Sequence, residues 1–204
     1  MRMKDRWYGD NRDLVKWTVL LAIARKYKIT SILQVLYYSP TDWGHIELDG
    51  EEVPVPTELL THFRDVNSIC NLACELRIET FKEPFTNDST ARQNYTESLI
   101  QVIRNHKVDP VIVFLDPDTG LEPESGTLNS SHVSKTEVGL VWNALKSGDI
   151  ALFYQHQDNR AGREWIERKR TQFANAIKID IALVKKAHAS SIASDVAFYF
   201  IQKA

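Results

Sequence analysis

The feature that most constrains this chain is the apolar run Val-Ile-Val-Phe-Leu at residues 111–115, which is followed directly by Asp116, Pro117 and Asp118. Five apolar residues without alternation predict a strand covered on both faces, as in a parallel sheet packed between helices. Because proline has no N–H to donate to a sheet, the strand is predicted to end there. Asp116 and Asp118 are therefore placed at the carboxyl end of a central strand.

A second apolar run, residues 150–154, ends in the same way, with the polar sequence Gln155-His-Gln-Asp-Asn-Arg160. In open α/β sheets, ligands bind beyond the carboxyl ends of the strands. Two strand ends rich in acidic, basic and imidazole groups therefore predict one functional site at this edge of the sheet.

Strands and helices alternate along the chain, which predicts a mostly parallel sheet with helices on both faces. Two final strands without a helix between them predict an antiparallel pair. The fold class expected is α/β, a single-domain Rossmann-like three-layer sandwich over residues 1–204. Residues 44–56 are expected to form a loop or short hairpin, and Ser134 with Glu137 predicts a capping box. The expected helices span residues 11–27, 57–74, 87–107, 134–147 and 163–177, and the expected strands span residues 30–38, 76–81, 111–115, 150–154, 179–184 and 195–201.

The first expected helix carries Leu14, Trp17, Leu21 and Ala24 at helical spacing, which predicts that these four side chains form its buried face. The chain begins without the apolar core of a secretory signal, and no run approaches the length of a membrane span. We therefore expect a cytoplasmic protein with no membrane partner. A net charge of −2 gives no overall electrostatic case for nucleic acid, so any such contact must be local.

The order of these elements, with a helix first and an antiparallel pair last, resembles the class I S-adenosylmethionine-dependent methyltransferase fold with one strand-helix unit fewer. Phe114-Leu-Asp-Pro-Asp-Thr119 lies where amino-methyltransferases carry an Asp-Pro-Pro-Tyr-like motif, and Leu36-Tyr-Tyr-Ser-Pro-Thr-Asp-Trp-Gly44 lies where the glycine-rich cofactor loop would be. More specifically, the chain resembles uncharacterised bacterial proteins related to the three-Cys-motif partner family, which also open with a lysine-containing helix.

The resemblance implies S-adenosylmethionine as cofactor and a nucleic acid or nucleotide as substrate or ligand. Asp116 would accept a hydrogen bond from the target amine. Tyr37, Tyr38 and Asp42 would line a cofactor loop that is altered, because tyrosines, Ser39 and Pro40 replace its glycines. Glu79, expected at the end of its strand, would accept hydrogen bonds from the ribose.

A second interpretation uses the same residues with a metal ion. Carboxylates of Asp116 and Asp118 with the imidazole of His156 suit Mg²⁺ or Mn²⁺, which predicts a phosphodiesterase or nuclease. Asp-Pro-Asp-Thr-Gly is also a good turn sequence, so these carboxylates have a purely structural alternative. His156 is likewise either a general base or a hydrogen-bonded loop residue.

Three further residues at this edge of the sheet are candidates for binding substrate: Gln155, Arg160 and His132. Their amide, guanidinium and imidazole groups can donate hydrogen bonds to a phosphate or carboxylate. Residues 4–13 mix basic and aromatic side chains, which suits either nucleic acid or packing against the core. A third interpretation is a non-catalytic binding module on a degenerate methyltransferase fold.

Overall fold

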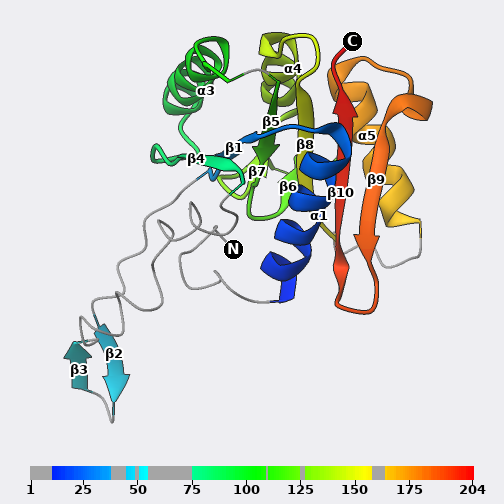
Figure 1. The fold of residues 1–204 in the computed structure, drawn as a ribbon. Coiled ribbons are helices and arrows are strands. Elements are labelled where there is room, and N and C mark those ends of the chain that lie inside the picture. Colours follow the sequence, from blue (N-terminus) through cyan, green and yellow to red (C-terminus); the bar gives the residue numbers. More distant parts are fainter. Residues whose placement is uncertain are drawn as a thin grey trace.

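The computed structural model describes residues 11–37, 45–48, 51–54, 75–108, 110–124, 127–157 and 164–204. Its centre is a six-stranded sheet in the order β4-β1-β5-β8-β10-β9 (Figure 1). The first four strands in that order are parallel, β10 runs antiparallel to both of its neighbours, and the expected antiparallel pair at the end of the chain is confirmed. The strands are β1 (Ser31–Val35), β4 (Arg77–Phe81), β5 (Val111–Leu115), β8 (Ile150–His156), β9 (Lys185–Ala189) and β10 (Ala193–Gln202).

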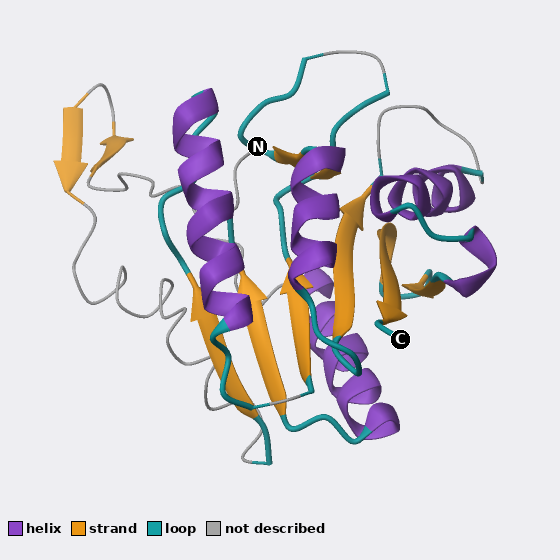
Figure 2. Ribbon diagram, turned by 90° about the horizontal axis from the view of Figure 1, so that it is seen from above, coloured by secondary structure: helices purple, strands orange, loops and turns teal. Residues whose placement is uncertain are grey.

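Helices lie on both faces of this sheet (Figure 2), so the predicted Rossmann-like α/β fold is confirmed. One face packs against α3, α4 and α5, and the other face packs against α1. The expected helix at residues 57–74 lies outside the described residues. The four described α-helices are α1 (Asn11–Tyr27), α3 (Ser89–Arg104), α4 (Lys135–Ala144) and α5 (Trp165–Ile177).

Smaller elements join this framework. The expected hairpin is confirmed as β2 (His45–Leu48) paired antiparallel with β3 (Glu51–Pro54). The loop after β5 contains a short parallel pair, β6 (Gly120–Leu121) with β7 (His132–Val133). A 3₁₀ helix, η3 (Ile181–Leu183), leads into β9.

Helix starts follow the expected capping chemistry. At α4, the Ser134 side chain accepts from the Glu137 N–H while the Glu137 carboxylate accepts from the Ser134 N–H, which is the predicted capping box. At α3, the Asp88 carboxylate accepts from the Ala91 N–H. These caps fix where both helices begin, and therefore how the loops before them approach the carboxyl edge of the sheet.

Alternate residues of the central strands face different layers. In β5, Val111, Val113 and Leu115 pack with the layer of α3, α4 and α5, whereas Ile112 and Phe114 pack with α1. The continuous apolar run thus reflects a strand buried on both faces, as its sequence predicted. By the same alternation, Asp116 falls on the side of α1.

The structure corrects two expectations. Residues 179–184 are not a strand, because the Asp180 side chain accepts from the Ala182 N–H and starts η3, and the edge strand forms at Lys185–Ala189 instead. The buried face of α1 is confirmed at Trp17 and Ala24, but Leu14 is 58% exposed. Lys16, Leu20 and Ile23 are buried in addition.

No helix in the described ranges is both long enough and apolar enough to cross a membrane.

Candidate functional site

The carboxyl ends of the central strands meet as the sequence predicted. The Asp116 N–H donates to the Val35 carbonyl at 3.0 Å, which joins the ends of β5 and β1. The His156 N–H donates to the Thr119 carbonyl at 2.8 Å, which joins the end of β8 to the loop after β5. This loop and the three strand ends form the candidate site. Its side chains divide between the two faces of the sheet.

On the face of α1, the carboxylate of Asp116 is held by two donors. Lys16 Nζ lies 3.0 Å from Asp116 Oδ2, and Gln34 Nε2 donates to the same oxygen at 2.7 Å. Lys16 Nζ also lies 2.9 Å from Asp13 Oδ1 and sits over the ring of Tyr154. Asp116 is 1% exposed and Lys16 is 6% exposed. Asp116 therefore belongs to a buried ion-pair cluster that ties α1 to β1 and β5.

The electrostatics of this cluster favour the charged pair. Burial acts to lower the pKa of Lys16, but the carboxylates of Asp116 and Asp13 outweigh it and hold that pKa above its usual value. Burial raises the pKa of Asp116, while the Lys16 ammonium and the Gln34 amide oppose this increase. Lys16 thus remains an ammonium ion and has no capacity to act as a base at neutral pH.

His156 belongs to a second cluster on the same face. Its Nε2 lies 3.1 Å from Asp195 Oδ2, and its Nδ1 lies 2.9 Å from the Gln157 carbonyl oxygen. Arg12 donates to the same Asp195 oxygen from Nε and Nη2, at 3.1 and 2.5 Å. The guanidinium of Arg12 holds the pKa of Asp195 below its usual value. Both ring nitrogens of His156 therefore face oxygen atoms.

Asp118 lies beside this second cluster. Burial raises the pKa of Asp118 to about 6, against a hydrogen bond with Ser131 and the attraction of His156. Within the ranges that the structure describes, no three His, Cys, Asp or Glu side chains gather as metal ligands. The metal-site prediction for Asp116 and Asp118 is therefore unsupported by this geometry, since Lys16 and Gln34 already engage the first carboxylate.

Gln155, predicted to bind substrate, points to the other face and holds the loop after β5. Its Nε2 donates to the carbonyls of Thr119 and His156, and its Oε1 accepts from the Leu121 N–H at 3.0 Å. Gly120 has φ +130°, and a Cβ there would lie 2.4 Å from the Gln155 side chain. The close approach requires glycine, and the geometry gives Gln155 a structural role.

His132 is fixed by the same loop. Its Nδ1 lies 2.8 Å from Asn129 Oδ1, and burial lowers its pKa. Its carbonyl accepts from the buried Arg92, which also forms two hydrogen bonds with the Glu137 carboxylate, at 2.8 and 2.5 Å. Arg92 stacks over the ring of Phe85. This network anchors α3, α4 and the loop as one unit.

The described part of the expected cofactor loop is packed with aromatic side chains. Tyr37 has φ +48°, a left-handed conformation in which glycine is favoured. Its ring is buried against Phe85 and Tyr95, and its N–H donates to the Tyr95 hydroxyl at 3.2 Å. Tyr38, Asp42 and Arg160 lie outside the described residues.

The predicted placement of Glu79 is wrong. Glu79 is the third of five residues in β4, so it does not lie at the carboxyl end of the strand, and its carboxylate pairs with Arg77 at 2.5 Å. Of the four residues expected to bind S-adenosylmethionine, Tyr37 has a buried ring and Glu79 lies in the middle of its strand, whereas Tyr38 and Asp42 are not among the described residues.

Sequence reasoning missed the partners of the predicted residues. Lys16 precedes Leu20 by four residues and Ile23 by seven, so helical spacing alone could have placed it on the buried face of α1. Asp13, three residues before it, could have suggested an ion pair. Nothing local in the sequence links Gln34 to Asp116, because that contact depends on how β1 and β5 pair.

No protein-family model and no curated protein match the chain, so the expected relation to the three-Cys-motif partner family finds no support. Among solved structures, the chain is similar to an O-methyltransferase family protein from Burkholderia thailandensis, with 10% identity and a TM-score of 0.40. The alignment covers 95% of this chain but only 58% of that one. A likeness at this level carries no functional argument.

Proposed function

We propose that this protein is a non-catalytic binding module on a methyltransferase-like fold, and that its ligand is a nucleic acid or a nucleotide. The observation that carries the proposal is the position of Lys16, whose ammonium lies between the carboxylates of Asp13 and Asp116. The resemblance assigns the Asp116 carboxylate to binding the target amine. In this protein the ammonium of Lys16 pairs with that carboxylate instead.

Two of the three candidate catalytic groups, Asp116 and His156, are engaged within the protein. Asp116 Oδ2 has two donors at 2.7 and 3.0 Å, and the carboxylate is buried among them. A general base needs a nitrogen or oxygen within hydrogen-bond reach of the proton it removes. His156 has an oxygen beside each ring nitrogen, so it has no nitrogen directed at a substrate.

The topology supports the methyltransferase-like part of the proposal. A helix precedes the first strand of the sheet, and the final pair is antiparallel, which are the features on which the resemblance rests. Tyr37 keeps a backbone conformation that suits glycine while its side chain fills the space beside it. At this position the Tyr37 ring therefore occupies space that a glycine would leave open.

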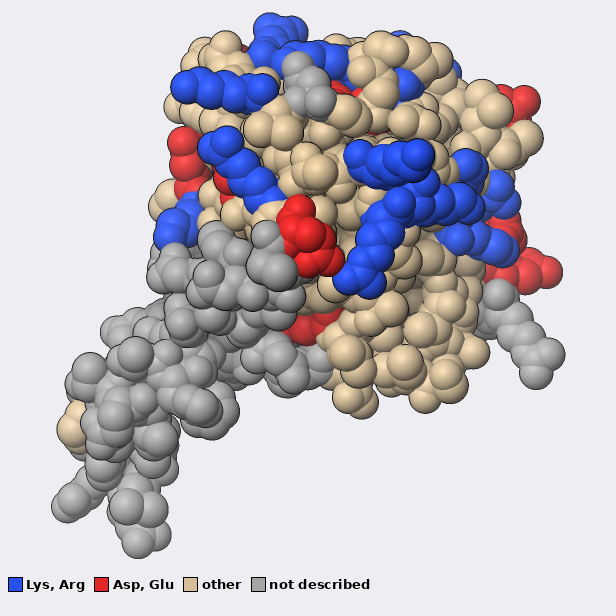
Figure 3. All heavy atoms as spheres, viewed as in Figure 1, with Lys and Arg blue, Asp and Glu red and all other residues tan. Residues whose placement is uncertain are grey.

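The ligand class is supported by a basic surface, defined here as Lys26, Lys28 and Lys185. Lys185 Nζ contacts the Tyr27 hydroxyl at 2.5 Å, which brings β9 against the last turn of α1. All three lysines are exposed, and no carboxylate in the described part of the chain pairs with them. Figure 3 shows Lys and Arg side chains gathered on this face. Such a cluster suits the phosphates of a nucleic acid.

The test of the ligand is fluorescence anisotropy with a labelled single-stranded oligonucleotide over a series of salt concentrations. Replacing Lys26, Lys28 and Lys185 with glutamine should weaken binding and reduce the slope of log K against log salt by about 2, at roughly 0.7 per phosphate contact. A matched control replaces the exposed cations Lys82, Arg104 and Lys107, and it should leave the slope unchanged. Equal effects of the two triple variants would count against the basic surface.

The test of the non-catalytic role uses Asp116→Asn. Oligonucleotide binding by this variant, measured well below its unfolding midpoint, should match that of the unchanged protein. Thermal unfolding should show no stabilisation by S-adenosylmethionine, because only a ligand of the folded state raises the midpoint. A rise with this cofactor, together with methyl transfer that Asp116→Asn abolishes, would refute the proposal.

A further inference from the structure

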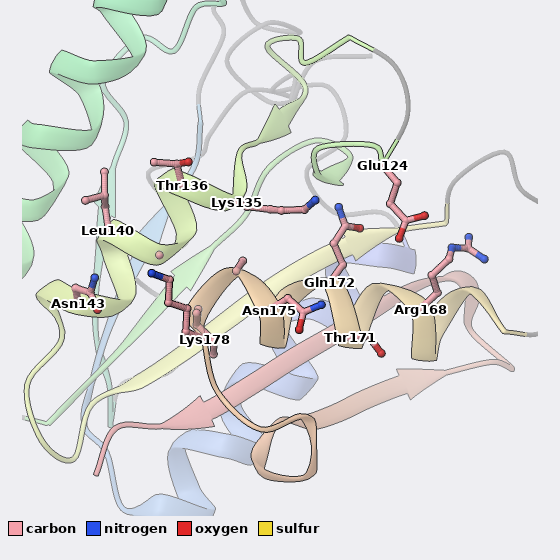
Figure 4. A pocket seen from close by; sticks show the side chains of 13 residues that line it. Glu124, Lys135, Thr136, Leu140, Asn143, Arg168, Thr171, Gln172, Asn175 and Lys178 are labelled. Carbon is pink, nitrogen blue, oxygen red and sulfur yellow. The ribbon is translucent and has the colours of Figure 1, made fainter.

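A groove on the outer surface of the helical layer lies between α4 and α5 (Figure 4). Its volume is about 580 Å³, which is within the range of small-molecule sites. The groove is on the face of the sheet opposite α1, so it is separate from the Asp116 cluster. A ligand in this groove would therefore bind independently of the Asp116 cluster and of the basic surface.

Close packing of the two helices forms the floor of the groove. A Cβ at Gly139 would lie 2.9 Å from the Ala176 carbonyl oxygen, so glycine allows α5 to approach α4 at this point. The walls carry short polar side chains, which leave the space open; they are Thr136, Asn143, Thr171 and Asn175. Leu140, 45% exposed, adds an apolar contact surface.

The charged side chains that line the groove are three cations, Lys135, Arg168 and Lys178, and one carboxylate, Glu124, so its lining has a net positive charge. Lys135 begins α4 and Lys178 follows α5, and both side chains line the groove. In the described ranges no carboxylate forms an ion pair with either ammonium group. Figure 4 shows the Lys135 side chain extending toward Gln172. An anion entering here would meet ammonium groups with which no described carboxylate forms an ion pair.

Gln172 supplies the second observation. Its side chain is only 4% exposed, and its Nε2 donates to the Glu122 carbonyl at 2.6 Å. This bond fixes the orientation of the amide, because the reverse orientation would place two oxygen atoms together. The buried Oε1 has no hydrogen-bond partner among the residues that the structure describes, and Gln172 lines the groove between Lys135 and Glu124 (Figure 4). A buried acceptor of this kind favours a ligand that brings a donor.

We propose that the groove binds a phosphorylated polyol, such as a sugar phosphate. The phosphate pairs with the ammonium of Lys135, and an adjacent hydroxyl donates to Gln172 Oε1. The amides of Asn143 and Asn175 take further hydroxyls, since amide and hydroxyl groups are complementary in hydrogen bonding. None of the described lining residues is aromatic, so a nucleobase would find no ring to stack on.

The experiment is a calorimetric titration of the full chain with ribose 5-phosphate, with ribose and inorganic phosphate as separate probes. Ribose 5-phosphate should bind at least about tenfold more tightly than either fragment, because each fragment satisfies only one of the two groups. Lys135→Met should weaken ribose 5-phosphate binding by about tenfold or more. Lys82→Met, a matched change of an exposed lysine outside both the groove and the basic surface, should leave it unchanged.

Several results would overturn the proposal. Ribose 5-phosphate binding no better than inorganic phosphate would mean a simple anion site. A Lys135→Met variant that loses stability but keeps the affinity would mean that this lysine only satisfies the Gln172 oxygen. Displacement of ribose 5-phosphate by a short oligoribonucleotide at equal phosphate concentration would show that the groove binds nucleic acid instead of a sugar phosphate. Absence of heat at millimolar ribose 5-phosphate, with no shift in the unfolding midpoint, would exclude the site.

Discussion

Replacing Lys16 with methionine should destabilise the protein in a pH-dependent way. Methionine has a similar length and suits a buried helix position, so the main change is loss of the ammonium between Asp13 and Asp116. Asp116 is 1% exposed and would remain as a buried carboxylate without its cation. Removing one partner of a buried ion pair typically costs about 3–5 kcal/mol.

The structure also sets a ceiling on this cost, because Asp116 can take up a proton instead of staying charged. Protonating a carboxyl group with an unfolded-state pKa of about 3.9 costs about 1.4 kcal/mol for each pH unit above that value. The ceiling is therefore about 4 kcal/mol at pH 7 and about 1.5 kcal/mol at pH 5. The destabilisation by Lys16→Met should fall by more than half between these two conditions.

Urea unfolding at pH 5 and pH 7 measures both values. The exposed Lys26 on the same helix provides the control, and Lys26→Met should change the free energy of unfolding by no more than about 0.5 kcal/mol. Adding Asp116→Asn to Lys16→Met should recover much of the loss at pH 7, because no buried charge then remains at that position. A loss below about 1 kcal/mol at both pH values would refute the buried ion-pair cluster.

Two further predictions concern the loop after β5. Burial raises the pKa of Asp118 to about 6, from about 3.9 in the unfolded chain. Between these two pH values the native state keeps a proton that the unfolded state has released. The free energy of unfolding therefore falls as the pH rises through this range. Asp118→Asn should remove this decrease, which amounts to about 1–2 kcal/mol after allowing for partial exposure. Urea unfolding from pH 4 to pH 7 measures it. Parallel curves of unfolding free energy against pH for the variant and the unchanged protein would contradict the prediction. Gly120→Ala should cost about 2–4 kcal/mol, because a Cβ at φ +130° would collide with Gln155. A shift in thermal midpoint of only a degree or two would show that the loop adapts.

Most of the framework could be predicted because local signals and global packing agree. The run at residues 111–115 is buried on both faces, and Ser134 with Glu137 starts a helix as its capping pattern indicates. The expected strand at residues 179–184 failed because a local side-chain cap competed with the apolar pattern there. The edge strand Lys185–Ala189 contains two lysines and a histidine, as suits an exposed sheet edge. Because it has no apolar run, its sequence does not indicate a strand.

The sequence predicted where the candidate site lies, but not which side chains its residues contact. Parallel strands bring their carboxyl ends to one edge, so the positions of Asp116 and His156 follow from the order of elements. Their partners come from distant segments: Lys16 from α1, and Asp195 from β10. Such pairs depend on how helices and strands pack in three dimensions, which periodicity along the chain does not encode.

The place of β10 in the sheet also bears on how the chain is synthesised. β10 lies between β8 and β9, yet both of these strands leave the ribosome before it does. Until Ala193–Gln202 has emerged, β8 presents an open edge, and β9 lacks the strand with which it pairs in the described part of the chain. A nascent chain without Ala193–Gln202 therefore exposes a template for aggregation, and the described sheet is complete only once β10 lies between β8 and β9.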